Sequence, residues 1–202
     1  MKKALILMLA VLLFLSSCQK STYPCEVLEA LDSQEYYVVM DLGENRIYEI
    51  AQKGDCYMIR DREWKNSVFC KGDTVVSLDP EEKQYTTGVE EESLDVRKLR
   101  LEQGDFSFVK AEQTEDTTVY HCLRKSGGPM GFGEENPYRF VYQNGKLIRI
   151  ETDVMANGAV AYTTRFPVLE FQSELPDHVS FAIPEDYSCV PAGAMNGMLA
   201  GT

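Results

Sequence analysis

Residues 36–78 read YYVVMDLGENRIYEIAQKGDCYMIRDREWKNSVFCKGDTVVSL, five short runs of alternating apolar and polar residues separated by turn-like residues. Alternation with a period of two is typical of strands that bury one face. The stretch therefore predicts five consecutive antiparallel strands, at Tyr36–Leu42, Arg46–Gln52, Asp55–Asp61, Ser67–Lys71 and Thr74–Leu78. This meander decides the fold class.

The turns between these runs set a register for the meander. We expect two-residue turns at Glu44-Asn45, Lys53-Gly54 and Gly72-Asp73, and a three-residue loop at 62–64. This register gathers the apolar residues on one face of a curved sheet, and we take that face as the candidate ligand-binding surface. The nine face residues are Tyr37, Val39, Tyr48, Ile50, Tyr57, Ile59, Phe69, Val76 and Leu78.

The same register places Cys56 opposite Cys70 on neighbouring strands. Directly opposed cysteines can form a disulfide, and disulfides persist in exported proteins. A Cys56–Cys70 disulfide is one interpretation, and two free thiols are the other.

The chain on both sides of the meander extends this pattern. A helix is expected to start at Thr22 or Tyr23, before Pro24, and to run to about Ser33. A turn at Asp79–Gln84 and a short helix at Glu90–Leu101 follow the meander. Further strands are expected at Phe106–Ala111, Val119–Lys125, Tyr138–Gln143, Leu147–Met155 and Val160–Phe171, with hairpin turns at Asn144-Gly145 and Asn157-Gly158. The predicted fold is mainly β, a curved antiparallel half-barrel sheet of about 10–11 strands.

The N-terminus has the features of an export signal. Lys2 and Lys3 precede the apolar run Ala4–Leu15, which is too short to span a bilayer of about 30 Å. The sequence Leu15-Ser16-Ser17-Cys18 resembles the lipobox of bacterial lipoproteins, and the resemblance implies that Cys18 is acylated and becomes the mature N-terminus. Ordinary cleavage nearby is the alternative.

Four segments follow from these patterns. They are a signal peptide at 1–17, a tether at 18–23, a half-barrel domain at 24–190 and a loose tail at 191–202. A lipidated Cys18 implies a cell-envelope protein, on the outer membrane of a host with two membranes or the outer face of the plasma membrane otherwise.

Several features together resemble the lipoprotein-carrier (LolA/LolB-like) superfamily. They are the lipobox, the N-terminal helix, the tyrosine-containing meander, the turn at Leu78–Tyr85 and the closing sequences Leu175–Asp177 and Phe181–Pro184. The resemblance implies an open half-barrel whose concave sheet and helical lid enclose a cavity for acyl chains or other apolar molecules.

Composition and motifs argue against other classes of protein. With 20 basic and 32 acidic residues, the formal net charge of -12 disfavours nucleic-acid binding. There are two histidines, no G-x-S-x-G motif and no C-x-x-C pair, so we expect no enzyme activity, cofactor or metal site. His121 and Cys122 are adjacent and could be two metal ligands. Because neighbours on a strand point to opposite faces, one metal site cannot easily use both. The glycines within Lys125–Gly133 lack the Gly-Lys-Ser/Thr ending of a phosphate-binding loop, and a hairpin loop is the simpler interpretation.

Two functions fit these observations. The first is a non-enzymatic carrier or sensor that holds an apolar ligand, a lipid or acyl chain, against the nine face residues. The second is a lipid-anchored protein–protein interaction module with a closed core and no ligand. A carrier should contain a cavity of several hundred Å³, whereas a module should be packed shut.

Overall fold

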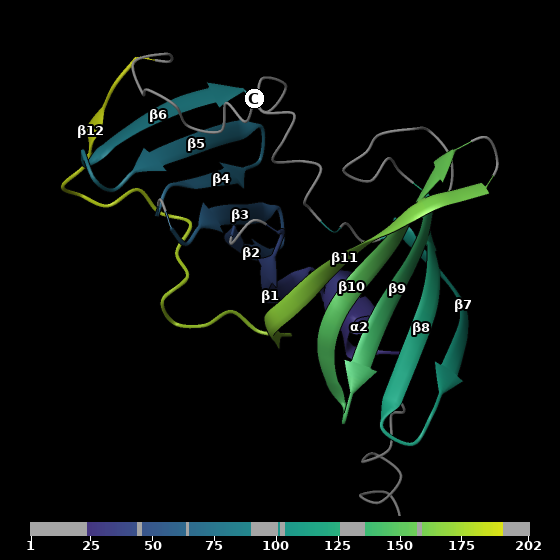
Figure 1. Ribbon diagram of the computed structural model, residues 1–202. Coiled ribbons are helices and arrows are strands. Elements are labelled where there is room, and N and C mark those ends of the chain that lie inside the picture. Colours follow the sequence, from purple (N-terminus) through teal and green to yellow (C-terminus); the bar gives the residue numbers. More distant parts are fainter. Residues whose placement is uncertain are drawn as a thin grey trace, which may run out of the picture.

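The computed structural model describes residues 24–43, 46–63, 65–89, 101, 104–125, 136–156 and 159–191. Within them, twelve strands form one sheet in the order β12-β6-β5-β4-β3-β2-β1-β11-β10-β9-β8-β7. All neighbouring pairs are antiparallel except β12 and β6. The sheet curves strongly and does not close (Figure 1). The predicted fold class, a mainly β half-barrel, is confirmed.

Most elements lie where the alternation of residues placed them. The helix α2 spans Glu26–Ser33. The first half of the sheet contains β1 (Glu35–Asp41), β2 (Ile47–Lys53), β3 (Cys56–Asp61), β4 (Ser67–Lys71), β5 (Thr74–Asp79) and β6 (Gln84–Val89). The second half contains β7 (Phe106–Gln113), β8 (Thr117–Arg124), β9 (Asn136–Gln143), β10 (Lys146–Ala156) and β11 (Ala159–Gln172), and β12 (Ser188–Cys189) returns to the first half. Of these strands, β6 and β12 were not predicted from the sequence.

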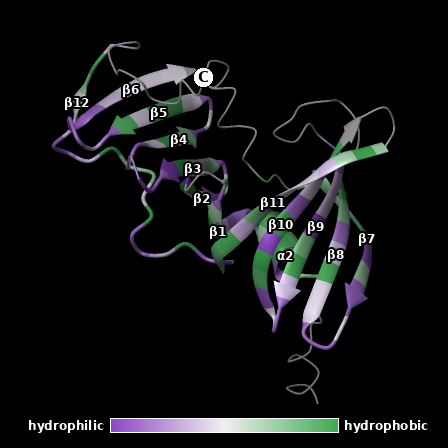
Figure 2. Cartoon of the chain, in the orientation of Figure 1, coloured by the Kyte–Doolittle hydropathy of each residue, from purple (hydrophilic) through white to green (hydrophobic). Residues whose placement is uncertain are grey.

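Each face of the first half of the sheet buries its own hydrophobic cluster. One cluster joins α2 to both halves of the sheet, and Val27 donates its backbone N–H to the Tyr142 hydroxyl at 3.2 Å. The other cluster lies on the opposite face of β1–β5, beneath residues 173–187. We call 173–187 the closing segment, because it runs from the end of β11 back to β12 (Figure 1). Hydrophilic and hydrophobic residues alternate along several strands of the second half (Figure 2).

The nine face residues do not share one face, which corrects the prediction. All nine are buried, but Tyr48, Ile50, Tyr57 and Ile59 belong to the cluster on the α2 side. The remaining five belong to the cluster beneath the closing segment: Tyr37, Val39, Phe69, Val76 and Leu78.

Two loop lengths explain the correction. The pairing of β1 with β2 closes at Leu42 and Arg46, whose backbone hydrogen bond measures 3.0 Å, so three residues separate the partners where two were expected. The pairing of β3 with β4 closes at Asp61 and Asn66, so four residues separate them where three were expected. A one-residue change in either loop exchanges the two faces of the following strand.

The expected Cys56–Cys70 disulfide is also wrong, for the same reason. Cys70 pairs with Tyr57, and Cys56 pairs with Lys71. The two cysteines therefore point to opposite faces of the sheet, and they form no disulfide with each other. Cys70 is buried on the α2 side.

Other predictions fall outside the described residues. These are the signal peptide at 1–17, Cys18 and the tether at 18–23, all of the helix at Glu90–Leu101 except Leu101, the glycine-containing loop and most of the tail. Leu101 itself is buried, and its backbone exchanges hydrogen bonds of 3.2 and 3.3 Å with the Tyr36 hydroxyl.

Candidate binding site

A partly open cavity of about 420 Å³ lies between the first half of the sheet and the closing segment. Its lining divides between the two elements. The sheet side contributes Arg60, Lys65, Ser67, Leu78 and Pro80, and the closing segment contributes Ser180, Ala182, Ile183, Pro184 and Tyr187. Cavities of about 300–1,000 Å³ are typical of sites for small ligands.

The pairing of the strands explains which side chains reach the cavity. Ser67 lies opposite Leu78 in the β4–β5 ladder, and Arg60 lies opposite Ser67 in the β3–β4 ladder. Opposed residues point to the same face of a sheet. The three side chains therefore form a row across three strands at the edge of the cluster beneath the closing segment.

The closing segment is held over this row at its C-terminal end. Ser188 donates its backbone N–H to the Lys83 carbonyl at 3.0 Å, and Val190 donates to the Tyr85 carbonyl at 2.8 Å. Lys83 also forms an ion pair with Asp186 at 2.8 Å, but both side chains are largely exposed. Because exposed ion pairs contribute little, the backbone bonds and the apolar contacts of the segment set its position.

The apolar part of the cavity continues the cluster beneath the closing segment. Ile183 and Tyr187 are half-buried and pack against the cluster that contains Leu78 and Phe69. Leu78 is 8% exposed, so it lies at the boundary between the packed cluster and the open space. The cavity thus has both apolar and polar side chains in its lining, as small-molecule sites commonly have.

Glu49 does not line the cavity, but it is the ion-pair partner of Arg60, which does. This carboxylate is almost fully buried and accepts a hydrogen bond from Arg62 Nε at 2.7 Å and a longer one from Arg60 Nη1 at 3.4 Å. The hydrogen bond from Arg62 to Glu49 is the main cause that raises the pKa of Arg62. Glu49 is therefore committed mainly to Arg62, and Arg60 is its looser partner.

Of the nine face residues, only Leu78 lines this cavity. The other eight are buried within one of the two packed clusters. The sequence prediction thus found core residues and missed Arg60, Lys65, Ser67 and Ser180. The available signal was the Leu175–Pro184 sequence, whose apolar residues required a sheet face to cover.

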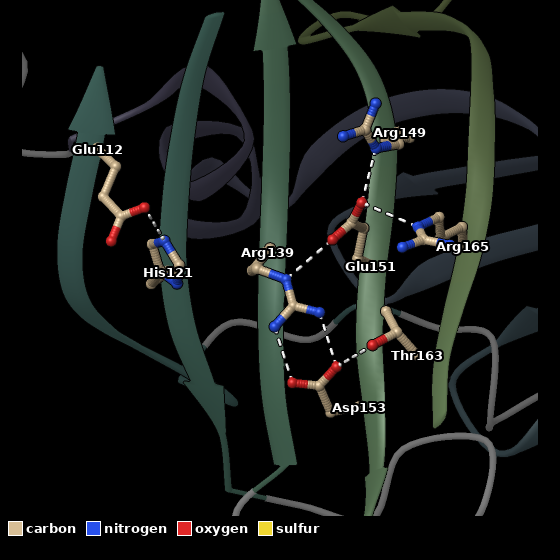
Figure 3. A network of polar contacts seen from close by, with 8 residues as sticks. All are labelled: Glu112, His121, Arg139, Arg149, Glu151, Asp153, Thr163 and Arg165. Atoms are coloured by element: carbon tan, nitrogen blue, oxygen red, sulfur yellow. Dashed lines mark hydrogen bonds and ion pairs between the residues drawn. The ribbon is translucent and has the colours of Figure 1, made fainter. Parts of the chain in front are cut away.

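A second group of polar side chains lies on the outer face of the second half of the sheet (Figure 3). Arg139 makes two hydrogen bonds of 2.7 Å to Asp153 and one of 2.9 Å to Glu151. Thr163 donates to Asp153 at 2.7 Å, and Arg149 donates to Glu151 at 2.7 Å. These charges are satisfied by one another, which is the pattern of a structural network.

The network lowers the pKa values of its two carboxylates. Hydrogen bonds from Arg139 hold the pKa of Asp153 below its usual value. For Glu151, burial opposes ionisation, but hydrogen bonds from Arg149 and Arg139 outweigh it and lower the pKa. Both carboxylates therefore remain ionised at neutral pH.

His121 and Cys122 lie on opposite faces of β8. The His121 Nε2 atom is 3.4 Å from Glu112 on the outer face, whereas Cys122 is buried in the α2-side cluster. The expectation that these two neighbours point to opposite faces of the strand is confirmed. In the described ranges, no group of three or more His, Cys, Asp or Glu side chains is arranged to hold a metal ion. No helix among the same residues is long and apolar enough to cross a membrane.

The structure is similar to an uncharacterized conserved protein from Thermus thermophilus, at 12% identity and a TM-score of 0.46, over 82% of this chain and 97% of that one. It is also similar to a LolA superfamily protein from Nitrosomonas europaea, at 13% identity and a TM-score of 0.29, over 75% of this chain and 94% of that one. No family model and no curated protein matches the chain.

Proposed function

We propose that this protein is a lipid-anchored cell-envelope protein that binds an apolar ligand, a lipid or an acyl chain, in a non-enzymatic carrier or sensor role. The observation that carries the proposal is the cavity of about 420 Å³ between the sheet and the closing segment. Leu78 of the sheet and Ile183 and Tyr187 of the closing segment contribute to its lining, and it is partly open to solvent. A protein that lacked a ligand would gain stability by filling such a space with side chains.

The proposed location depends on the N-terminal sequence. The lipobox-like Leu15–Cys18 follows a positively charged start and an apolar run of signal-peptide length. Acylation at Cys18 would leave only the short stretch 19–23 before the folded domain, so the cavity would lie close to the membrane surface. A carrier or sensor of membrane lipids would benefit from that position.

The second candidate is a protein–protein interaction module with a closed core. The packing on the α2 side of the sheet favours it, because Val27, Leu28 and Leu31 of the helix fill the space against buried tyrosines of both halves. On that side the described residues form a packed core. The two candidates therefore differ in whether the cavity beneath the closing segment holds a ligand.

Native mass spectrometry of the exported protein carrying Cys18→Ser tests the proposal. A copurified lipid or acyl species would support it, and Ala182→Trp, which places a large ring at the cavity, should abolish that species. Ala111→Trp, on the exposed part of β7, is the matched control and should retain it. If the parent protein carries no such species and binds no added acyl chain, the interaction module replaces the proposal.

A further inference from the structure

The charge of the cavity lining is opposite to the charge of the chain. Arg60 and Lys65 are its only charged members, and no carboxylate lines it among the residues that the structure describes. The whole chain has 32 acidic and 20 basic residues. Two cations and no acid in one lining are thus a local reversal of the protein's overall charge, and such a reversal selects ligands by their sign.

Glu49, the carboxylate that pairs with Arg60, does not neutralise these cations. Glu49 carries one negative charge, and its shorter bond, 2.7 Å, goes to Arg62, leaving Arg60 the longer one at 3.4 Å. Lys65 forms no ion pair with any other residue in the part of the chain that the structure describes, and its side chain is exposed. Glu49 is thus shared by two arginines, and Lys65 adds a further cation to the lining.

Two serine hydroxyls add hydrogen-bonding groups to the lining. Ser67 is buried on β4, and Ser180 approaches from the closing segment. Serine hydroxyls donate hydrogen bonds to carboxylate and phosphate oxygens, and a guanidinium group presents several donors in a fixed plane. The apolar groups Leu78, Ile183 and Tyr187 line the same space.

We propose that the cavity recognises an amphiphile with an anionic head group. The carboxylate or phosphate oxygens are bound by Arg60 and Lys65 with help from the two serine hydroxyls, and the chain lies against the apolar side chains of the lining. This inference rests on the proposed function, because it names the chemical class of the apolar ligand. It predicts that charge on the head group, and not chain length alone, determines affinity.

Laurate and 1-dodecanol, at concentrations below micelle formation, are the probes that separate the two proposals. Both molecules have the same chain length, and only laurate is anionic. Isothermal titration calorimetry on the exported Cys18→Ser protein should show laurate binding at least about tenfold tighter, the equivalent of one charge-assisted hydrogen bond. A third arm with lauryl phosphate tells whether a carboxylate or a phosphate is preferred, and preference for either over the alcohol supports the inference.

Single substitutions assign the effect to the cavity. Lys65→Gln and Arg60→Gln should each weaken laurate binding about tenfold and leave dodecanol binding unchanged. Lys71→Gln is the matched control, since Lys71 is an exposed lysine at the other end of β4 and does not line the cavity. Thermal unfolding checks that each variant is folded before its binding is interpreted.

Each result has a distinct meaning. Equal affinity for laurate and dodecanol would overturn the inferred preference for an anionic head group, and so would tighter binding of the cationic analogue dodecylammonium. Either result would leave the proposed function standing. If both Lys65→Gln and Arg60→Gln still bind laurate more tightly than dodecanol, recognition of the head group does not take place in this cavity. Failure of the parent protein to bind any of the probes would overturn the inference and the proposed function together.

Discussion

Arg139 connects three strands through side chains alone. It lies on β9, and its two acidic partners lie on β10, where Asp153 also accepts a hydrogen bond from Thr163 of β11. The guanidinium group makes two bonds to Asp153 and keeps a third donor for Glu151. A planar, permanently charged group suits this arrangement, and a lysine at the same position would lose the paired geometry.

The network predicts a loss of stability in acid. Because the pKa values of Asp153 and Glu151 are lower in the folded protein, their contribution is fully present above the unfolded values of about 4 and is lost as the pH falls through the folded values. Asp153→Asn should destabilise the protein by about 1–3 kcal/mol at pH 7. Urea unfolding between pH 7 and pH 2 measures the difference in the free energy of unfolding between the parent and the variant, and this difference should shrink in acid. A difference that does not change with pH would contradict a stabilising role for the ionised Asp153.

The cysteines should differ sharply in reactivity. Cys25, Cys70 and Cys122 are buried, and burial, together with the nearby Cys25, raises the pKa of Cys122 to about 12. Since the thiolate is the reactive form, Cys122 should resist labelling at pH 8. Cys189, which is exposed, should react first.

Maleimide labelling followed by intact-mass measurement checks this order in the Cys18→Ser protein. Unfolding in urea without a reductant should make all five remaining thiols reactive. A mass that shows two thiols still blocked would indicate a disulfide and contradict the reduced state of the cysteines described above.

At the scale of elements, side chains at the closing segment differ in their surroundings. Some belong to the packed core, and others line the cavity. Phe69 of β4 is 3% exposed within the cluster that the segment covers, whereas Ile183 of the segment is half-buried and lines the cavity. A side chain beside open space loses fewer contacts when it is truncated. The two positions should therefore respond differently to alanine.

We expect Phe69→Ala to reduce the free energy of unfolding by about 3–5 kcal/mol and Ile183→Ala by less than about 2 kcal/mol. The Ile183 variant should nevertheless bind an apolar fluorescent probe more weakly than the parent does. Chemical denaturation and probe titration measure the two quantities. Similar large losses of stability at both positions would show that Ile183 belongs to a closed core.

The alternation of residues was enough to predict most strands, because burial of one face imposes a period of two. It could not predict which face each strand presents, since that depends on single residues in the loops after Asp41 and Asp61. Gly72-Asp73 was a turn of the expected length, and the pairing of Phe69 with Val76 was correct there. An error of one residue in the length of each of two loops was enough to divide the nine face residues between the two faces of the sheet.

Local sequence patterns could not predict the candidate site, because its parts are far apart in the sequence. Its two sides come from β3–β5 and from residues 180–187, which are separated by about half of the chain. The sequences Leu175–Asp177 and Phe181–Pro184 entered only as part of the family resemblance, and they did not indicate the strands against which they pack. Arg60 and Lys65 look like ordinary surface cations until the closing segment is placed beside them.

At the scale of the whole molecule, the sheet is lined on its two faces by different parts of the chain. The α2 helix covers one face near the N-terminus, and the closing segment covers the other near the C-terminus (Figure 1). Neither cover is a long element, so both depend on the sheet for their position. The face beneath the closing segment keeps the cavity, and the α2 face is packed in the described residues.

Attachment to a membrane through Cys18 is the remaining prediction at this scale. Several acyl chains on one residue hold a protein stably at a bilayer, whereas a single chain does not. Cys18→Ser should therefore release the protein from the membrane fraction and abolish incorporation of a radiolabelled fatty acid. Cys189→Ser, which removes an exposed cysteine of the folded domain, should change neither result. If the Cys18→Ser protein still sediments with membranes and keeps the label, the acylated residue lies elsewhere, and the cavity need not face a membrane at close range.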